Sequence, residues 1–205
     1  MEKEKIHSIL RLWILPLVAV VLCGLIFMEN RTVITDTEGA VKFYLRSLKQ
    51  GHGGIGDEGN FNNSISFAGL AVGDIVLGGY PNCGYGEYSH AALYIGEGMV
   101  LEGYGNGIYI QPVNRFRSYS QVALLKVEVA PEVKARAVDY ALRQYKEAFY
   151  PLAFKKNERV WNCSKIIWKS YEKYGINLDY SNDLWIMPSI FKNSSYVRVI
   201  DERKI

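Results

Sequence analysis

Three residues of this chain could together carry out nucleophilic catalysis: Cys163, His90 and Glu102. Segment 161–168 reads WNCSKIIW, a pattern that places Cys163 in the first turn of a buried helix. The unpaired amides and positive dipole end of a helix N-terminus favour thiolate over thiol. His90 begins a segment with strand character, and Glu102 follows a second short apolar run. The set predicts a nucleophile, a base and an orienting carboxylate, in the chain order His, Glu, Cys.

Each of these residues also has an ordinary structural interpretation. Free cysteine is among the most buried residue types, and in an oxidising compartment Cys163 could instead form a disulfide with Cys83. A lone histidine is more often a hydrogen-bonded core residue, and Glu102 could be a solvated carboxylate on a sheet edge. Two features favour catalysis: the helix-start position of Cys163, and the small Ala92, which shares a strand face with His90 and leaves room for a partner.

The composition fits one domain without a nucleic-acid partner. The chain has 205 residues, with 24 basic and 21 acidic side chains and no Lys/Arg-rich block. Cys23, Cys83 and Cys163 form no metal-binding pattern, and His52 has no nearby ligand partners. The glycine-rich segment 50–60 lacks the Gly-Lys-Ser/Thr ending of a phosphate loop. We therefore expect no metal ion and no organic cofactor.

The N-terminal region predicts a membrane span. Residues 12–28 are uncharged and apolar, and a spanning helix needs about 20 residues, which this stretch reaches if interfacial residues are counted. We expect a transmembrane signal anchor over residues 9–28, after a cytoplasmic tail over residues 1–8. A cleaved signal peptide is the alternative, but no small-x-small cleavage site follows the apolar run.

The charges around this segment predict its orientation. Lys3, Lys5 and Arg11 precede the apolar run, and only Arg31 follows it closely. Because basic residues stay on the cytoplasmic side, we expect a single-pass protein of the cell membrane whose catalytic domain is extracytoplasmic.

The rest of the chain predicts an α+β domain in which an antiparallel sheet packs against helices. A juxtamembrane helix, capped by Asp36 or Thr37, and the glycine-rich loop occupy residues 29–70, and the catalytic domain occupies residues 71–205. Helices are expected from Pro131 through Ala148 and from about Asn162 to Tyr174. The expected strands are 73–77, 89–95, 99–102, 108–111, 122–129 and a last one at 196–200.

Several motifs, taken in order, resemble a known family. They are GDIVL at 73–77, Ser89-His90, Glu102, NCS at 162–164 and the late Pro188-Ser189 pair. Over about residues 70–200 the chain resembles the YiiX/YebB-like permuted papain-like amidases, relatives of NlpC-type peptidases. In that family a circular permutation places the histidine before the cysteine, as here.

The resemblance implies a permuted papain-like fold and a role for each site residue. Cys163 would be the nucleophile, His90 the base and Glu102 the polar orienter. Tyr150, thirteen residues before Cys163, falls where NlpC-type enzymes carry a tyrosine near the oxyanion site. The family commonly has an acidic residue where this chain has Lys165. We therefore expect the local charge and the contacts with substrate to differ from those of the family.

The combined expectation is a membrane-anchored thiol hydrolase that cleaves amide bonds, with cell-wall peptides as its substrates. A lipid amide or ester hydrolase, or an acyltransferase of the same fold, is one alternative. The other is a non-catalytic module that binds wall peptides or a partner protein in a Tyr- and Gly-rich groove. A thiol-reactive probe would separate these classes, because an activated thiolate reacts much faster than an ordinary thiol.

Overall fold

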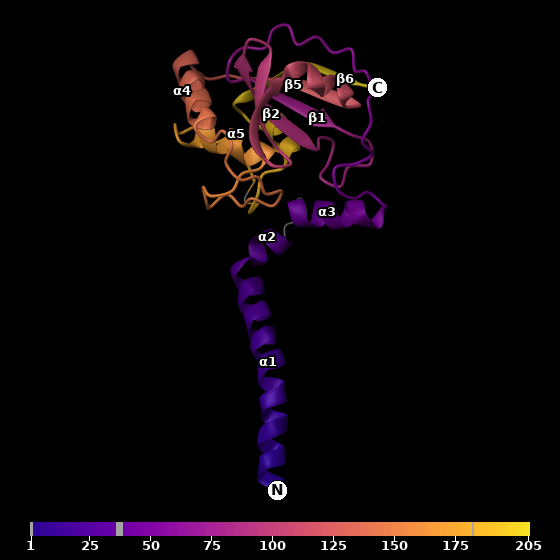
Figure 1. The fold of residues 1–205 in the computed structure, drawn as a ribbon, viewed down its shortest axis with the longest axis vertical. Helices are drawn as coiled ribbons and strands as arrows, with labels where there is room; N and C mark the ends of the chain where they lie inside the picture. Colours follow the sequence, from indigo (N-terminus) through magenta and orange to yellow (C-terminus); the bar gives the residue numbers. More distant parts are fainter. Residues whose placement is uncertain (1, 36–38, 182) are drawn as a thin grey trace.

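The computed structural model describes residues 2–35, 39–181 and 183–205, and shows an α+β domain preceded by a long helix (Figure 1). Within those ranges the domain has one six-stranded sheet of order β4-β3-β2-β1-β5-β6, in which all neighbours are antiparallel. The strands are β1 (Ile75–Gly79), β2 (His90–Gly96), β3 (Met99–Tyr104), β4 (Gly107–Pro112), β5 (Gln121–Val127) and β6 (Val197–Lys204). The predicted α+β class with an antiparallel sheet is confirmed.

In the described part of the chain, three α-helices precede the sheet, and two more lie between β5 and β6. They are α1 (Glu2–Glu29), α2 (Arg31–Thr35), α3 (Ala40–Lys49), α4 (Pro131–Leu142) and α5 (Cys163–Glu172), together with the 3-10 helices η1 (Val113–Ser118) and η2 (Pro188–Asn193). The expected caps Asp36 and Thr37 lie outside the described residues, and α3 begins after Gly39. The proposed division at residues 70 and 71 stays a prediction.

Helix α4 is shorter than its sequence pattern suggested. It ends at Leu142 rather than near Ala148. Beyond it the chain pairs with β4 instead of continuing the helix: the Lys146 amide donates to the Ile108 carbonyl at 2.9 Å, and Lys146 has a φ of +68°. Tertiary pairing therefore overrides the local helical pattern.

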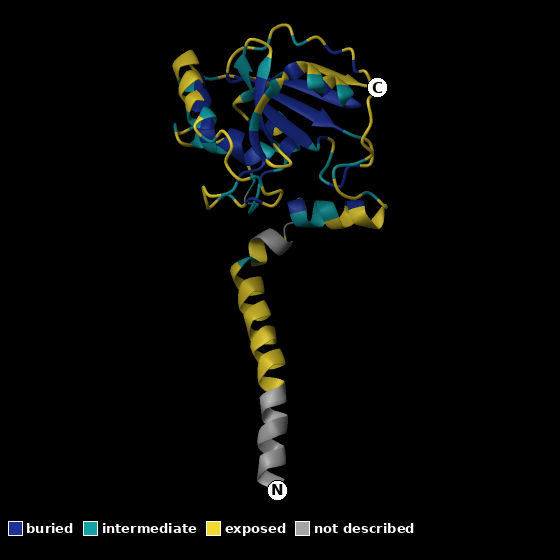
Figure 2. Ribbon diagram, in the orientation of Figure 1, coloured by how far each residue is buried: buried dark blue, intermediate teal, exposed yellow. Residues whose placement is uncertain are grey.

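The central strands of the sheet are buried on both faces, whereas the edge strand β6 is largely exposed (Figure 2). Ile75 and Leu77 of β1 belong to one apolar cluster, which includes residues of α4 and α5. Val76 points to the opposite face and joins a second cluster with Ile65 and with Phe116 of η1. Because successive strand side chains alternate between faces, a single strand contributes to both cores.

Helix α5 is fixed firmly against the sheet. Its side chains Ile166, Ile167 and Tyr171 are fully buried. The Tyr171 hydroxyl donates to the Gly73 carbonyl at 2.5 Å, just before β1. The helix that begins with Cys163 is thus held along its length, which fixes the position of its first turn.

Helix α1 covers the segment expected to cross a membrane. No helix in the described ranges is both long and apolar enough for a membrane crossing, so the transmembrane helix expected over residues 9–28 is not found. The uncharged stretch between Arg11 and Glu29 has 17 residues, fewer than the roughly 20 that a crossing needs.

Candidate active site

Cys163 is the first residue of α5, as the sequence predicts. Asn162 caps the helix, because its side-chain oxygen accepts the Lys165 amide at 2.7 Å. The Asn162 side-chain amide also donates to the Pro151 carbonyl at 3.1 Å, which ties the helix start to the preceding loop. The cap leaves the first-turn amides at the edge of the cleft, where they can stabilise a negative charge.

Gly103 allows β3 to approach this helix start closely. A Cβ atom at residue 103 would lie 3.1 Å from the carbonyl carbon of Asn162 and 3.1 Å from the amide nitrogen of Cys163. A glycine is therefore required for the present spacing between β3 and α5. Its neighbour Glu102 is brought into the same region by this contact.

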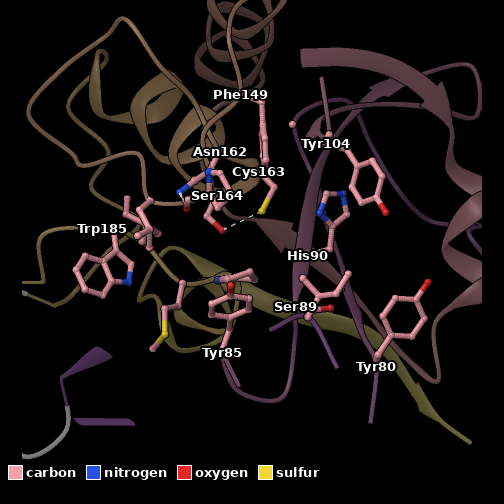
Figure 3. Close-up of a pocket in the computed structure, with 18 of the residues that line it drawn as sticks. Tyr80, Tyr85, Ser89, His90, Tyr104, Phe149, Asn162, Cys163, Ser164 and Trp185 are labelled. Atoms are coloured by element: carbon pink, nitrogen blue, oxygen red, sulfur yellow. Dashed lines mark hydrogen bonds between the residues drawn. The ribbon is translucent and has the colours of Figure 1, made fainter. Parts of the chain in front are cut away.

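His90 begins β2 and is hydrogen-bonded to Glu102 of β3. Its Nε2 atom lies 2.7 Å from Glu102 Oε2, and the two side chains are only 7% and 1% exposed. The ring lies nearly parallel to those of Phe116 and Tyr119, with centroids 5.7 and 6.1 Å away. These contacts fix the orientation of the imidazole and leave Nδ1 as the nitrogen that can contact the thiol of Cys163. The ring points toward that thiol (Figure 3).

The surroundings of Cys163 favour its ionised form. Burial opposes ionisation, but the hydrogen bond and charge of His90, the Ala91 amide and the Ser164 hydroxyl outweigh it and lower the pKa of Cys163. The Ser164 hydroxyl lies 3.8 Å from the sulfur.

His90 is shifted in the complementary direction. Burial alone would lower the pKa of His90, but its interactions with Cys163 and Glu102 raise the pKa to about 9. The two opposite shifts both favour the thiolate–imidazolium form of the pair over the thiol–imidazole form.

Arg115 of η1 also contacts Glu102, which the sequence pattern did not reveal. Its guanidinium lies 2.5 Å from Glu102 Oε1 and over the ring of Tyr104, 5.3 Å from the ring centre. The available signal was indirect: a fully buried glutamate needs a cationic or hydrogen-bonding partner. Nothing local shows which of the arginines supplies it.

Tyr150 is placed differently from the other predicted residues. Its side chain is 53% exposed and does not line the cleft that contains Cys163. The backbone of Tyr150 instead donates to the Trp161 carbonyl at 2.8 Å. The structure thus brings together Cys163, His90 and Glu102, but not Tyr150. The Cys163 amide remains as a donor for an oxyanion.

Lys165 points away from the reacting groups. Its ammonium donates to the side chain of Asn157 at 3.1 Å and to the Val160 carbonyl at 2.9 Å. Burial lowers its pKa to about 8. Lys165 does not line the cleft, so it holds the turn before α5 rather than adding charge to the site.

The cleft beside Cys163 has a volume of about 200 Å³ and a mainly apolar lining. Within the described ranges, no Lys, Arg, Asp or Glu side chain lines it. Its aromatic lining residues include Tyr80, Tyr85, Tyr104, Tyr119, Phe149 and Trp185. The three cysteines are free, so the alternative Cys83–Cys163 disulfide is not formed.

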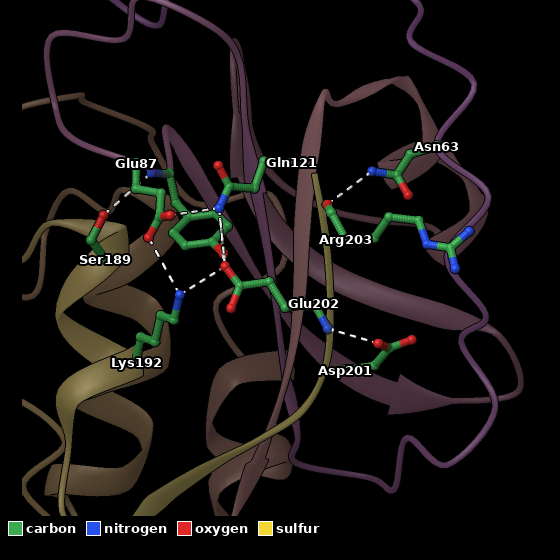
Figure 4. A network of polar contacts seen from close by, with 9 residues as sticks. Asn63, Glu87, Gln121, Ser189, Lys192, Asp201, Glu202 and Arg203 are labelled. Atoms are coloured by element: carbon green, nitrogen blue, oxygen red, sulfur yellow. Dashed lines mark hydrogen bonds and ion pairs between the residues drawn. The ribbon is translucent and has the colours of Figure 1, made fainter. Parts of the chain in front are cut away.

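A polar network supports the segment that precedes His90 (Figure 4). Lys192 of η2 lies 2.7 Å from Glu202 of β6 and 3.4 Å from Glu87. Gln121 donates to both carboxylates, at 3.0 and 2.6 Å. The network connects β6 and η2 with the loop that leads into His90.

Comparisons with known proteins identify a family and a similar fold. A model of the family described as permuted papain-like amidase enzymes, YaeF/YiiX, C92 family, matches residues 70–195. Among solved structures, the yiiX protein of Escherichia coli O157:H7 is similar, with a TM-score of 0.55 and 14% identity over 65% of this chain and 98% of that one. A search of curated proteins finds no match.

The similar Escherichia coli protein is described as a metalloprotein. In the part of the present chain that the structure describes, no group of three or more His, Cys, Asp and Glu side chains could hold a metal ion. The described residues therefore form no metal site of that kind.

The family match covers more than half of the chain, and the likeness in structure supports the same fold. The resemblance seen in the sequence motifs is therefore confirmed, and amide hydrolysis is the class of activity that the family supports. The chain belongs to the YaeF/YiiX family of permuted papain-like amidases.

Proposed function

We propose that the protein is a cysteine amidase in which Cys163, His90 and Glu102 carry the reaction. The observation that carries this proposal is the arrangement at the start of α5. The thiol faces an imidazole that is hydrogen-bonded on its other side to a buried carboxylate, at 2.7 Å. This is the order of contacts that activates a cysteine nucleophile.

The geometry supports a two-step mechanism through an acyl-enzyme. The Cys163 thiolate adds to the carbonyl carbon, and the Cys163 amide at the helix start stabilises the oxyanion. The His90 imidazolium gives its proton to the leaving amine, which breaks the carbon–nitrogen bond. Neutral His90 then takes a proton from water, whose oxygen attacks the thioester, and Cys163 leaves as thiolate. Glu102 keeps the imidazole oriented throughout.

Cell-wall peptides are the first proposed substrates. A catalytic domain on the outer face of a bacterial-type membrane would meet the amide bonds of the wall. The fold itself does not select among amides.

Lipid-like amides or esters are the second proposed substrates, and the cleft lining favours them. The charged side chains that would bind peptide carboxylates or amines are missing from the lining in the described ranges. Leu152 of the lining is itself exposed, and the exposed apolar Phe154 follows two residues later. An apolar acyl chain fits such a surface better than a charged peptide does.

The test compares the full chain with Cys163→Ala, under reducing conditions. New amines are measured after incubation with purified peptidoglycan, and free fatty acid after incubation with vesicles that contain an N-acyl amide. Cys83→Ala is the matched control, because Cys83 is also a buried free thiol but does not line the cleft. Product from wild type and Cys83→Ala alone supports the proposal and identifies the substrate class.

A result without product from either substrate would favour the rival, a non-catalytic binding module. Rapid labelling of Cys163 by iodoacetamide near neutral pH would still indicate an activated thiol. Slow labelling at the rate of Cys83 would contradict the proposed nucleophile.

We propose in addition that α1 attaches the protein to a membrane, with the catalytic domain outside the cytoplasm. The support is the uncharged stretch 12–28 of α1, in which apolar side chains are exposed, for example Trp13 at 69% and Leu15 at 80%. Such a surface is unfavourable in water. The full chain should float with lipid vesicles, and Val18→Asp with Leu22→Asp should reduce flotation. Equal flotation of both would contradict attachment through α1.

A further inference from the structure

We propose that Arg115 is a positioning residue whose charge balances the buried cluster of Cys163, His90 and Glu102, and so keeps Cys163 ionised near neutral pH. The inference rests on the proposed function, because it concerns the same nucleophile. Arg115 does not line the cleft and acts through Glu102.

The contacts place Arg115 at the end of a continuous chain of polar groups. Glu102 is 1% exposed, and its two oxygens have different partners: Oε2 contacts His90 at 2.7 Å, and Oε1 contacts Arg115 at 2.5 Å. The Arg115 side chain is 34% exposed, so its guanidinium connects the buried carboxylate to the surface. The stacking over Tyr104 holds the guanidinium in place.

The sum of the charges in the cluster explains the role of Arg115. In the reactive state the cluster holds a thiolate, an imidazolium, a carboxylate and a guanidinium, whose charges sum to zero. Without Arg115 the same buried state carries one uncompensated negative charge, which is costly away from water. Uptake of one proton restores neutrality. Because a thiolate is intrinsically more basic than a carboxylate, that proton goes to Cys163.

The other titratable groups that face the cluster come from three directions. They are Tyr104 of β3, Tyr119 after η1, and Tyr80 and Tyr85 of the loop between β1 and β2. Burial raises the pKa of Tyr85 and of Tyr119, so these two phenols carry no charge near neutral pH. Arg115 is therefore the cation that balances Glu102 when His90 is paired with the thiolate.

The experiment measures the rate at which iodoacetamide alkylates Cys163 as a function of pH, in the full chain, with the modified peptide identified by mass spectrometry. In wild type the rate rises with the thiolate fraction. In Arg115→Met the midpoint of that rise should move up by about one pH unit. Arg115→Lys should recover most of the shift, because it restores the charge.

Arg117→Met is the matched control. Arg117 lies on the same 3-10 helix but over the ring of Phe67, 5.7 Å from its centre, and does not contact the cluster. Its midpoint should equal that of wild type. A purely structural role for Arg115 would lower the rate at all pH values without moving the midpoint, and that result overturns the proposal.

Arg115→Gln is a second test of the proposal if circular dichroism shows that Arg115→Met does not fold. Glutamine keeps a hydrogen-bond donor for Glu102 but removes the charge, so the midpoint should again rise. A wild-type midpoint in this variant would show that hydrogen bonding, not charge, is what Arg115 supplies. Alkylation needs no substrate, so an inactive amidase with the expected midpoint shift would refute the proposed function and leave this inference standing.

Discussion

At the scale of single residues, Cys163 and His90 function as one unit. Each shifts the titration of the other: the pKa of Cys163 is lowered and that of His90 is raised to about 9, against the opposing effect of burial on both. Neither residue would have these properties alone. Removal of one partner should therefore change the chemistry of the other.

His90→Asn should slow the alkylation of Cys163 at pH 7 by at least about tenfold. Without the imidazolium, burial dominates and the thiol stays protonated at that pH. The rate of iodoacetamide labelling measures the effect, and Cys83 in the same sample is the internal reference. A rate equal to that of wild type would show that the helix start alone activates Cys163.

The pH dependence of hydrolysis should have its upper limb near pH 9. The pKa of His90 is raised to about 9, and the imidazolium must be protonated to give its proton to the leaving amine. Activity should therefore be present below that pH and lost as pH rises through it. The profile of kcat/KM for the identified substrate measures this limb. A decline near pH 6.5, the ordinary range of histidine, would contradict the contacts described for His90.

Local sequence patterns were sufficient to propose the residues at the centre of the site. A helix start at Cys163 and a strand start at His90 are local features, and the structure places both there. The role of Arg115 depends on how η1 folds back over β3, which no local pattern encodes. Tyr150 was selected by its distance along the chain from Cys163, and that distance does not determine which way its side chain points.

At the scale of elements, the site depends on the contact between β3 and the start of α5. Gly103 lies close to the start of α5, and a Cβ there would also lie 3.0 Å from the Ile108 side chain. The strand contributes Glu102 and the helix contributes Cys163, so their spacing sets the geometry of the reacting groups. Beyond Leu142 the sequence favours a continued helix, but pairing of the backbone with β4 ends the helix there.

Gly103→Ala should reduce alkylation of Cys163 and hydrolysis by up to about tenfold, because the added Cβ pushes β3 and the start of α5 apart and catalysis is sensitive to displacements well below about 1 Å. The free energy of unfolding should fall by about 1–3 kcal/mol, as for overpacking elsewhere. Gly53→Ala is the matched control, because its nearest contact would be an ordinary one, 3.7 Å to Leu48. Unchanged alkylation in Gly103→Ala would show that β3 and α5 can separate without cost to the site.

At the scale of the whole molecule, the C-terminal elements complete both the sheet and the cleft. Strand β6 pairs with β5 along its length, and Pro188 at the start of η2 lines the cleft. Lys192 and Glu202 fasten these two elements together, 2.7 Å apart. Burial alone would raise the pKa of Glu202, but Lys192, Tyr88 and Gln121 outweigh it and lower that pKa.

The pH dependence of stability should reveal this network. A carboxylate with a lowered pKa stabilises the fold above its unfolded pKa, about 4.3 for glutamate, and this contribution is lost as pH falls through the folded value. Lys192→Met should therefore lower the Tm at pH 7 and reduce its dependence on pH below about 4.3. Thermal unfolding followed by circular dichroism measures both.

Arg198→Met is the control for that prediction. Its ion pair with Glu128 is largely exposed, at 56% and 50%, and exposed pairs contribute little to stability. An equal change in both variants would show that general surface charge, not the network of Glu202, determines the acid response.

The order of the elements along the chain has a consequence for the timing of biosynthesis. His90 and Glu102 are made first, Cys163 follows, and η2 and β6 come after all three. Until η2 and β6 have left the exit tunnel, β6 cannot pair with β5 and the part of the cleft wall that contains Pro188 is missing. A nascent chain should therefore keep Cys163 at the reactivity of an ordinary thiol until these elements emerge, and ribosome-bound chains stalled before that point should react with iodoacetamide more slowly than the folded protein.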